Sequence, residues 1–195
     1  MPVIRVNTVS ASKSSRRQML IRQAQGYLDL VHACCDFCEL APGIRDPLVY
    51  RAMDALGRLS KSDRRKPDAL FLTGQAFRAI ELYRDAIGSL REAARIQPEN
   101  TDTWLALGWC YKRIGRLDRA IESLEEALTI DPGAAMIHYN LACYWSLAGN
   151  VDVALNYLDN SLQIDGSFRN LIDGETDFDP IRDHPAFREL TAVVV

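Results

Sequence analysis

A fixed spacing of 34 residues constrains this chain more than any other feature of its sequence. Eight positions between Thr101 and Pro132 recur when the sequence is shifted by 34 residues in either direction. They are Trp104, Leu107, Gly108, Tyr111, Ala120, Leu124, Ala127 and Pro132, which align with Leu70, Thr73, Gly74, Phe77, Ala86, Leu90, Ala93 and Pro98 before them and with His138, Leu141, Ala142, Trp145, Ala154, Leu158, Ser161 and Gly166 after them. A period of this length indicates supersecondary units that stack on one another.

The residue types in these slots suit two helices that cross closely. The slot of Gly108 holds glycine or alanine in every copy, and so small a residue lets the two helices approach. The slot of Tyr111 holds a large ring in every copy, which fills the wider gap between neighbouring units. The slot of Pro132 holds proline or glycine, both of which end a helix.

Over residues 67–168 this pattern resembles the tetratricopeptide repeat. The resemblance implies an all-α fold, a right-handed superhelical α-solenoid built from antiparallel helix pairs. The repeats are expected at residues 67–100, 101–134 and 135–168.

The turn inside each repeat differs in one copy. Gly115 and Gly149 permit a tight turn in the second and third repeats, whereas Glu81 holds the same slot in the first. We therefore expect a less ideal turn in the first repeat, with its length unchanged.

The segment before the repeats is expected to hold two further helices. Residues 1–14 are interpreted as a flexible arm, and an amphipathic helix is predicted from Ser15 to Leu40. The second helix is predicted to begin at Asp46 and Pro47, which supply a capping side chain and a helix-starting proline. This pair, within residues 15–66, is either a degenerate repeat stacked in line or a cap that covers part of the array.

The segment after the repeats, residues 169–195, is similar to one that often closes bacterial tetratricopeptide arrays. The similarity rests on an acidic run around Phe178 followed by Ile181, Arg182, Pro185 and Phe187. We expect it to cover the second helix of the last repeat, with its acidic residues acting as helix caps or lying in a solvated loop.

The resemblance also implies where a partner binds, because the first helix of each repeat lines the concave surface. The candidate peptide-binding residues on the non-core stripes of these helices are Phe71, Gln75, Arg78, Leu105, Trp109, Lys112, Arg113, Met136, Tyr139, Asn140 and Cys143. Their rings and aliphatic chains would form an apolar floor with a basic edge, which favours a peptide or helix that is apolar with some acidic character. Alternatively, the chain's own N-terminal helix or its tail covers this floor.

Composition and motifs argue against other classes of function. The formal net charge of -3 gives no reason to expect nucleic acid or a membrane as a partner. The sequence shows no catalytic triad, phosphate-binding glycine loop or paired-carboxylate motif, so we expect a non-enzymatic protein without a cofactor. Two short basic runs, residues 13–17 and 58–66, lack the interleaved aromatic residues of nucleic-acid binding and are interpreted as solvated surface.

The cysteines suggest a reducing compartment and no metal. The chain has five, an odd number without framework spacing, which favours a cytoplasmic location. Cys34, Cys35 and Cys38 are interpreted as small packing residues, with a metal or redox site as the alternative.

The function expected from the sequence is therefore that of a protein–protein interaction module. Two alternatives stay open, a dedicated chaperone for a secreted or membrane-active client and a self-assembling structural scaffold.

Overall fold

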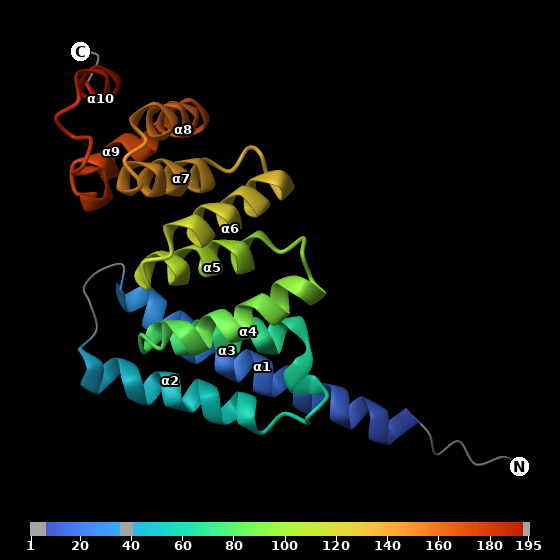
Figure 1. Ribbon diagram of the computed structural model, residues 1–195. Coiled ribbons are helices and arrows are strands. Elements are labelled where there is room, and N and C mark those ends of the chain that lie inside the picture. Colours follow the sequence, from blue (N-terminus) through green and yellow to red (C-terminus); the bar gives the residue numbers. More distant parts are fainter. Residues whose placement is uncertain (1–6, 36–40, 193–195) are drawn as a thin grey trace, which may run out of the picture. The chain divides into compact units, whose positions relative to one another are not determined.

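The computed structural model describes residues 7–35 and 41–192 and divides the chain into two compact units, Met1–Gln97 and Pro98–Val195. Within these described residues the secondary structure is helical, and consecutive helices pack in antiparallel pairs (Figure 1). The expected all-α fold of antiparallel pairs is confirmed. The first expected repeat shares a unit with the N-terminal helices, a grouping that the sequence did not predict.

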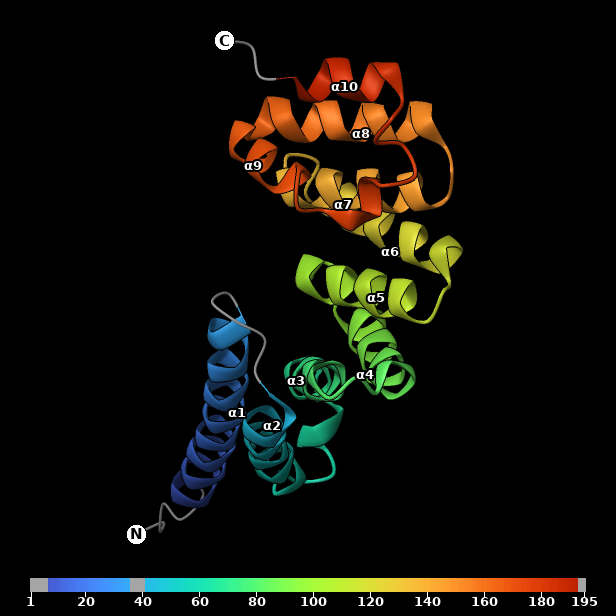
Figure 2. The same ribbon diagram turned by 90° about the vertical axis from the view of Figure 1, so that its left-hand side faces the viewer.

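The first unit contains two helix pairs and a short 3₁₀ turn. In chain order its elements are α1 (Asn7–Cys35), α2 (Pro42–Gly57), η1 (Asp63–Arg65), α3 (Pro67–Ala79) and α4 (Tyr83–Ile96). Helix α1 contacts both α2 and α3, and α2 also contacts α3 (Figure 2). Leu28 of α1, Val49 of α2 and Leu72 of α3 are buried in one shared core. Both a degenerate repeat stacked in line and a cap are compatible with these contacts, so the choice between them stays a prediction.

Two predicted helix starts in this unit are wrong. Helix α1 begins at Asn7 rather than Ser15, so residues 7–14 of the expected arm are helical. Helix α2 begins at Pro42, which takes the first helical position, and Pro47 lies inside the helix. Proline is accepted at the first position of a helix because the N–H that it lacks would have no helical partner there.

The second unit contains two helix pairs and the C-terminal segment. Its elements are α5 (Thr101–Arg113), α6 (Leu117–Ile130), α7 (Ala135–Leu147), α8 (Val151–Ile164), η2 (Gly166–Phe168), α9 (Arg169–Ile172), η3 (Thr176–Phe178) and α10 (Pro185–Thr191). Helix α10 packs on α8, as expected for a closing segment, whereas η3 lies against α7 (Figure 2). The contact between η3 and α7 agrees with the alternative that the tail covers part of the groove floor.

The turn inside each repeat closes with the same backbone hydrogen bond. The N–H groups of Leu82, Arg116 and Asn150 donate to the carbonyl oxygens of Phe77, Tyr111 and Trp145 at 2.9, 2.9 and 3.0 Å. The residue before each donor has a left-handed backbone, with φ of 64° at Glu81, 74° at Gly115 and 77° at Gly149. Residues other than glycine rarely adopt this conformation, so Glu81 is strained, while the turn of the first repeat keeps the closing hydrogen bond of the other two.

The small residues in the Gly108 slot do sit where two helices approach closely. A Cβ atom at Gly74 would lie 2.5 Å from Leu90 Cγ, and one at Gly108 would lie 3.0 Å from Leu124 Cδ2. Both distances are too short for an unstrained carbon contact, so an alanine at either position would require the leucine to move.

No helix in residues 7–35 and 41–192 is both long and apolar enough to cross a lipid bilayer.

Candidate peptide-binding site

Eight of the eleven candidate residues lie in the second unit, on α5 and α7. On α5, Leu105, Trp109 and Arg113 follow one another at intervals of four residues, and this spacing places them on one side of the helix. We call these three residues the α5 strip. Leu105 and Trp109 are half-buried and Arg113 is exposed, with its guanidinium carbon 5.5 Å from the centre of the Trp109 ring. The α5 strip thus offers solvent an apolar surface next to a positive charge.

Helix α7 carries the equivalent positions, but the chain itself covers them. Tyr139 and Cys143 occupy the slots of Leu105 and Trp109 one repeat later, and they are only 4% and 2% exposed. Their prediction as an open groove floor is therefore wrong. The C-terminal segment buries them, because η3 lies along α7.

Aromatic rings form the apolar part of the contact between the C-terminal segment and α7. The ring of Tyr139 lies 5.2 Å from that of Phe168 and 5.6 Å, edge-on, from that of Phe178. Phe178 is fully buried and lies 5.5 Å from Phe187 of α10. Ring pairs at these separations stabilise a fold beyond the area that they bury, so the segment is firmly anchored.

A charged pair makes the polar part of the cover. The Lys112 Nζ atom on α5 forms an ion pair with Asp177 of η3 and lies 5.7 Å from the centre of the Tyr144 ring. Asp177 is 8% exposed, and its backbone N–H donates to Glu175 Oε1 at 3.1 Å. The interpretation of the acidic tail as a solvated loop is therefore wrong for Asp177, and Lys112 belongs to this cover rather than to an open basic edge.

Beside this pair, Cys143, Glu175 and Asp177 bring three potential metal ligands within 4.8 Å of one another. Burial, reinforced by the two carboxylates, raises the pKa of the Cys143 thiol far above its ordinary value, so the thiol stays protonated at neutral pH. A metal would need the thiolate and would compete with Lys112 for Asp177. This arrangement favours an ordinary buried cluster, and the absence of a metal stays a prediction.

Burial also raises the pKa values of the Tyr139 and Tyr144 hydroxyls, with smaller contributions from the Cys143 thiol. Both phenols therefore stay neutral at any physiological pH. The covered face of α7 is an uncharged aromatic surface apart from the carboxylates that the tail brings.

The two remaining α7 residues lie closer to solvent. Met136 is 49% exposed and Asn140 is half-buried one helical turn later. They stay candidates at the edge of the covered face.

The three candidates in the first unit lie on α3. Phe71 packs against the buried core of that unit, and the buried Oε1 atom of Gln75 has no hydrogen-bond partner among the described residues. An Arg78 guanidinium nitrogen lies 3.0 Å from His32 Nε2 of α1, within hydrogen-bonding distance. Helix α1 therefore contacts the α3 stripe at one point at least, which the sequence allowed as an alternative.

Part of the cysteine prediction lies outside the structural description. Cys38 is outside the described residues, as are the side chains of Cys34 and Cys35. Their interpretation as packing residues stays a prediction.

Sequence reasoning missed Asp177 and Phe178 as residues of the site. A signal was present, because the tail has the acidic and aromatic chemistry expected of a partner peptide. The sequence allowed the tail as a cover for the groove floor, but it did not single out these two residues for that contact.

Comparison with known protein families supports the assignment of the repeat. Residues 51–101 and 71–135 match the family described as tetratricopeptide repeat. No curated protein sequence matches the chain.

Solved structures show the same fold. A crystal structure of MamA shares 22% identity over 75% of each chain with a TM-score of 0.57, and another shares 19% over 87% of this chain and 99% of its own with a TM-score of 0.59. YrrB, described as a TPR protein with an unusual peptide-binding site, shares 21% identity over 66% of this chain and 63% of its own, with a TM-score of 0.55. At these identities the likeness concerns the fold alone.

Proposed function

Because residues 51–135 make this chain a tetratricopeptide repeat protein, we propose that it is a non-enzymatic interaction module that binds a segment of another protein along the α5 strip. The bound segment carries an aromatic or aliphatic side chain next to a carboxylate. The apolar side chain packs on Leu105 and Trp109, and the carboxylate pairs with Arg113.

The observation that carries this proposal is the docking of the tail on α7. The pair Asp177 and Phe178 places a carboxylate against Lys112 and a ring against Tyr139. On the α5 strip, Leu105 and Trp109 occupy the repeat slots of Tyr139 and Cys143 but reach solvent, and Arg113 beside them supplies a positive charge. A partner segment with the chemistry of the tail is therefore complementary to the α5 strip.

The affinity expected for such a segment is modest. A short segment buries little area, and ordering it costs entropy. Arg113 already lies over the Trp109 ring, so the cation and the ring are held together before binding, which reduces that cost. YrrB, which has this fold, is described as having a peptide-binding site, and this lends general support to a peptide as the ligand.

Affinity capture from the native lysate tests the proposal. Trp109→Ala with Arg113→Glu removes the apolar surface and reverses the charge, so proteins captured by the unmodified chain should be lost while helical content stays intact. Arg119→Glu is the matched control, because it makes the same charge change at an exposed position on α6. Equal capture by the double variant and the control would contradict the proposal.

The two alternatives from the sequence remain predictions with simple tests. A dedicated chaperone would keep its client soluble only when the two are co-expressed. A self-assembling scaffold would increase in mass with concentration in light scattering. A cytoplasmic location also stays a prediction, which fractionation of the native cells would test.

A further inference from the structure

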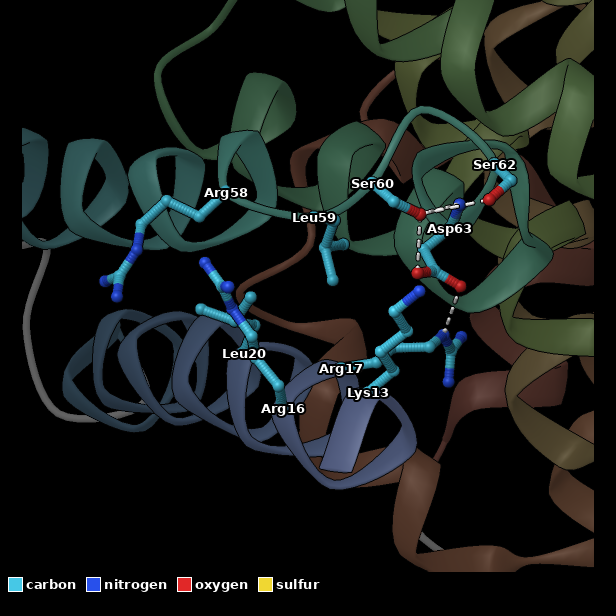
Figure 3. A pocket seen from close by; sticks show the side chains of 9 residues that line it. All are labelled: Lys13, Arg16, Arg17, Leu20, Arg58, Leu59, Ser60, Ser62 and Asp63. Atoms are coloured by element: carbon cyan, nitrogen blue, oxygen red, sulfur yellow. Dashed lines mark hydrogen bonds and ion pairs between the residues drawn. The ribbon is translucent and has the colours of Figure 1, made fainter. Parts of the chain in front are cut away.

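A cavity of about 510 Å³ lies in the first unit, between α1 and the segment that follows α2. Four cationic side chains line it, Lys13, Arg16, Arg17 and Arg58, against one carboxylate, Asp63. Figure 3 shows Arg16 and Arg58 on one side of the cavity and Lys13 and Arg17 beside Asp63 on the other. We call this cavity the basic pocket.

The fold creates the basic pocket from two distant parts of the sequence. Lys13, Arg16 and Arg17 are three and four residues apart on α1 and share one side of that helix. Arg58 follows the last residue of α2, about 40 residues later, and folding brings it next to them. The two basic runs that looked like separate solvated surfaces in the sequence therefore meet at one cavity.

Charge pairing neutralises only part of the pocket. Arg17 pairs with Asp63 at 3.3 Å and also with Asp68, so it is a fixed part of the wall. Asp63 in turn pairs with Lys66 at 2.8 Å and accepts a hydrogen bond from Ser60 Oγ at 2.7 Å. The Lys66 and Ser60 hydrogen bonds lower the pKa of Asp63, so its carboxylate is ionised at neutral pH and already engaged.

The positive charges of Lys13, Arg16 and Arg58 are less well neutralised by carboxylates. Arg58 reaches Asp54 at 3.9 Å, in an exposed pair one helical turn apart that contributes little. No ion pair among the described residues involves Lys13 or Arg16. Like charges gathered around a concave surface raise the local potential and attract an anion.

The lining of the pocket selects the kind of anion. No aromatic side chain lines it, so it lacks a platform on which nucleic-acid bases could stack. Its two apolar residues, Leu20 and Leu59, are 1% and 5% exposed and give the ligand little apolar contact. Arg16 and Arg58 contribute planar guanidinium groups, which bind phosphate oxygens in pairs. The volume is that of a small-ligand site.

We propose that the basic pocket binds a compact phosphate-bearing anion, with Lys13, Arg16 and Arg58 contacting the phosphate oxygens and Arg17 holding the wall. This site is separate from the α5 strip, and neither proposal depends on the other.

Titration calorimetry with inorganic pyrophosphate at low ionic strength tests the proposal. The unmodified chain should bind one pyrophosphate, and the affinity should fall as salt is added. Arg16→Gln with Arg58→Gln removes two charge-assisted contacts and should weaken binding at least about tenfold. Absence of binding by the unmodified chain would overturn the proposal.

A matched variant and a second anion make the test specific. Arg22→Gln with Arg91→Gln removes the same charge from exposed positions of the same unit outside the pocket, and it should bind pyrophosphate like the unmodified chain. Equal weakening in both double variants would overturn the site. Citrate of similar charge should bind more weakly, and equal binding would overturn the preference for phosphate. Circular dichroism checks that each variant keeps its helical content.

A second arm distinguishes the sources of the phosphate. Phosphatidylcholine vesicles that contain phosphatidic acid present a phosphate monoester at a membrane surface. The site would be assigned to a lipid headgroup if these vesicles capture the chain, if pyrophosphate displaces it from them, and if Arg16→Gln with Arg58→Gln abolishes the capture. Binding of pyrophosphate without vesicle capture would assign it to a small soluble anion, and failure in both arms would overturn the proposal.

Discussion

Helices α5 and α7 occupy equivalent places in successive repeats, yet one face is covered and the other reaches solvent. Leu105 and Trp109 of α5 align with Tyr139 and Cys143 of α7. The α7 pair is buried by the C-terminal segment, whereas the α5 pair is half-buried beside the exposed Arg113. The same repeat slot is thus buried under the tail in one helix and partly exposed to solvent in the other.

The covered slots also show which chemistry packs against this face of α7. The tail packs aromatic rings against α7 and buries one carboxylate there, and Lys112 of α5 pairs with that carboxylate. Residues that bury area should contribute to folding stability, and residues that face solvent should contribute little to it. Three substitutions measure this contrast, in order of decreasing expected effect.

The largest effect is expected from Phe178→Ala. Removing this fully buried ring leaves a cavity over α7 and should lower the free energy of unfolding of the second unit by about 3–5 kcal/mol. Urea titration followed by tryptophan fluorescence reports that unit alone, because Trp104, Trp109 and Trp145 all lie in it.

Leu171→Ala is the control for this substitution, since Leu171 lies in the same segment but is 51% exposed. It should change stability by less than about 0.5 kcal/mol. If Phe178→Ala were equally mild, the tail would not be what stabilises the α7 face.

A smaller effect is expected from Lys112→Met, which keeps the apolar length of the side chain and removes its charge. The Asp177 carboxylate then lacks its cation, and because the Lys112 side chain is 25% exposed the loss should be about 1–2 kcal/mol. Adding Asp177→Asn should recover part of this loss, which a double-mutant cycle measures in the same urea titration.

Arg116→Met provides the comparison, because it removes an exposed pair with Asp118 at 2.8 Å. Because this pair is fully exposed, its loss should change stability little. A Lys112→Met variant as stable as this control would show that the tail's carboxylate is well solvated.

The smallest effect is expected from Trp109→Ala. The ring is half-buried, and alanine favours the helix, so stability should change by about 1 kcal/mol or less. Tyr139→Ala on α7 removes a buried ring and should cost about 3–5 kcal/mol in the same titration. Similar costs for the two substitutions would remove the contrast between α5 and α7.

The sequence was sufficient to predict the repeat because each copy of the 34-residue period places similar residue types at the same helix–helix contacts. Gly74 and Gly108 lie where a Cβ atom would collide with a leucine, and Glu81 adopts the left-handed conformation of Gly115. These features depend on residues within one repeat, so the spacing of residues along the sequence is enough to predict them.

The covered face and the basic pocket could not be predicted in the same way. Nothing in the period specifies that Phe178 returns to α7, because the tail lies outside the repeat and its register is set by tertiary packing alone. Likewise, Arg16 and Arg58 become neighbours only when α1 and α2 pair. The early start of α1 was missed because residues 7–14 carry few apolar side chains to mark a helical stripe.

The most direct test of the central claim uses the tail's own chemistry as a ligand. A fluorescent peptide with the sequence of residues 173–182 is titrated into the unmodified chain and into the variant with Trp109→Ala and Arg113→Glu. We predict that the peptide binds the unmodified chain saturably and binds the double variant at least about tenfold more weakly. A peptide with alanine in place of Asp177 and Phe178 should not bind. Equal affinity for both proteins, as expected if the peptide only replaced the tail on α7, or no binding to either, would contradict the assignment of the α5 strip as the binding site.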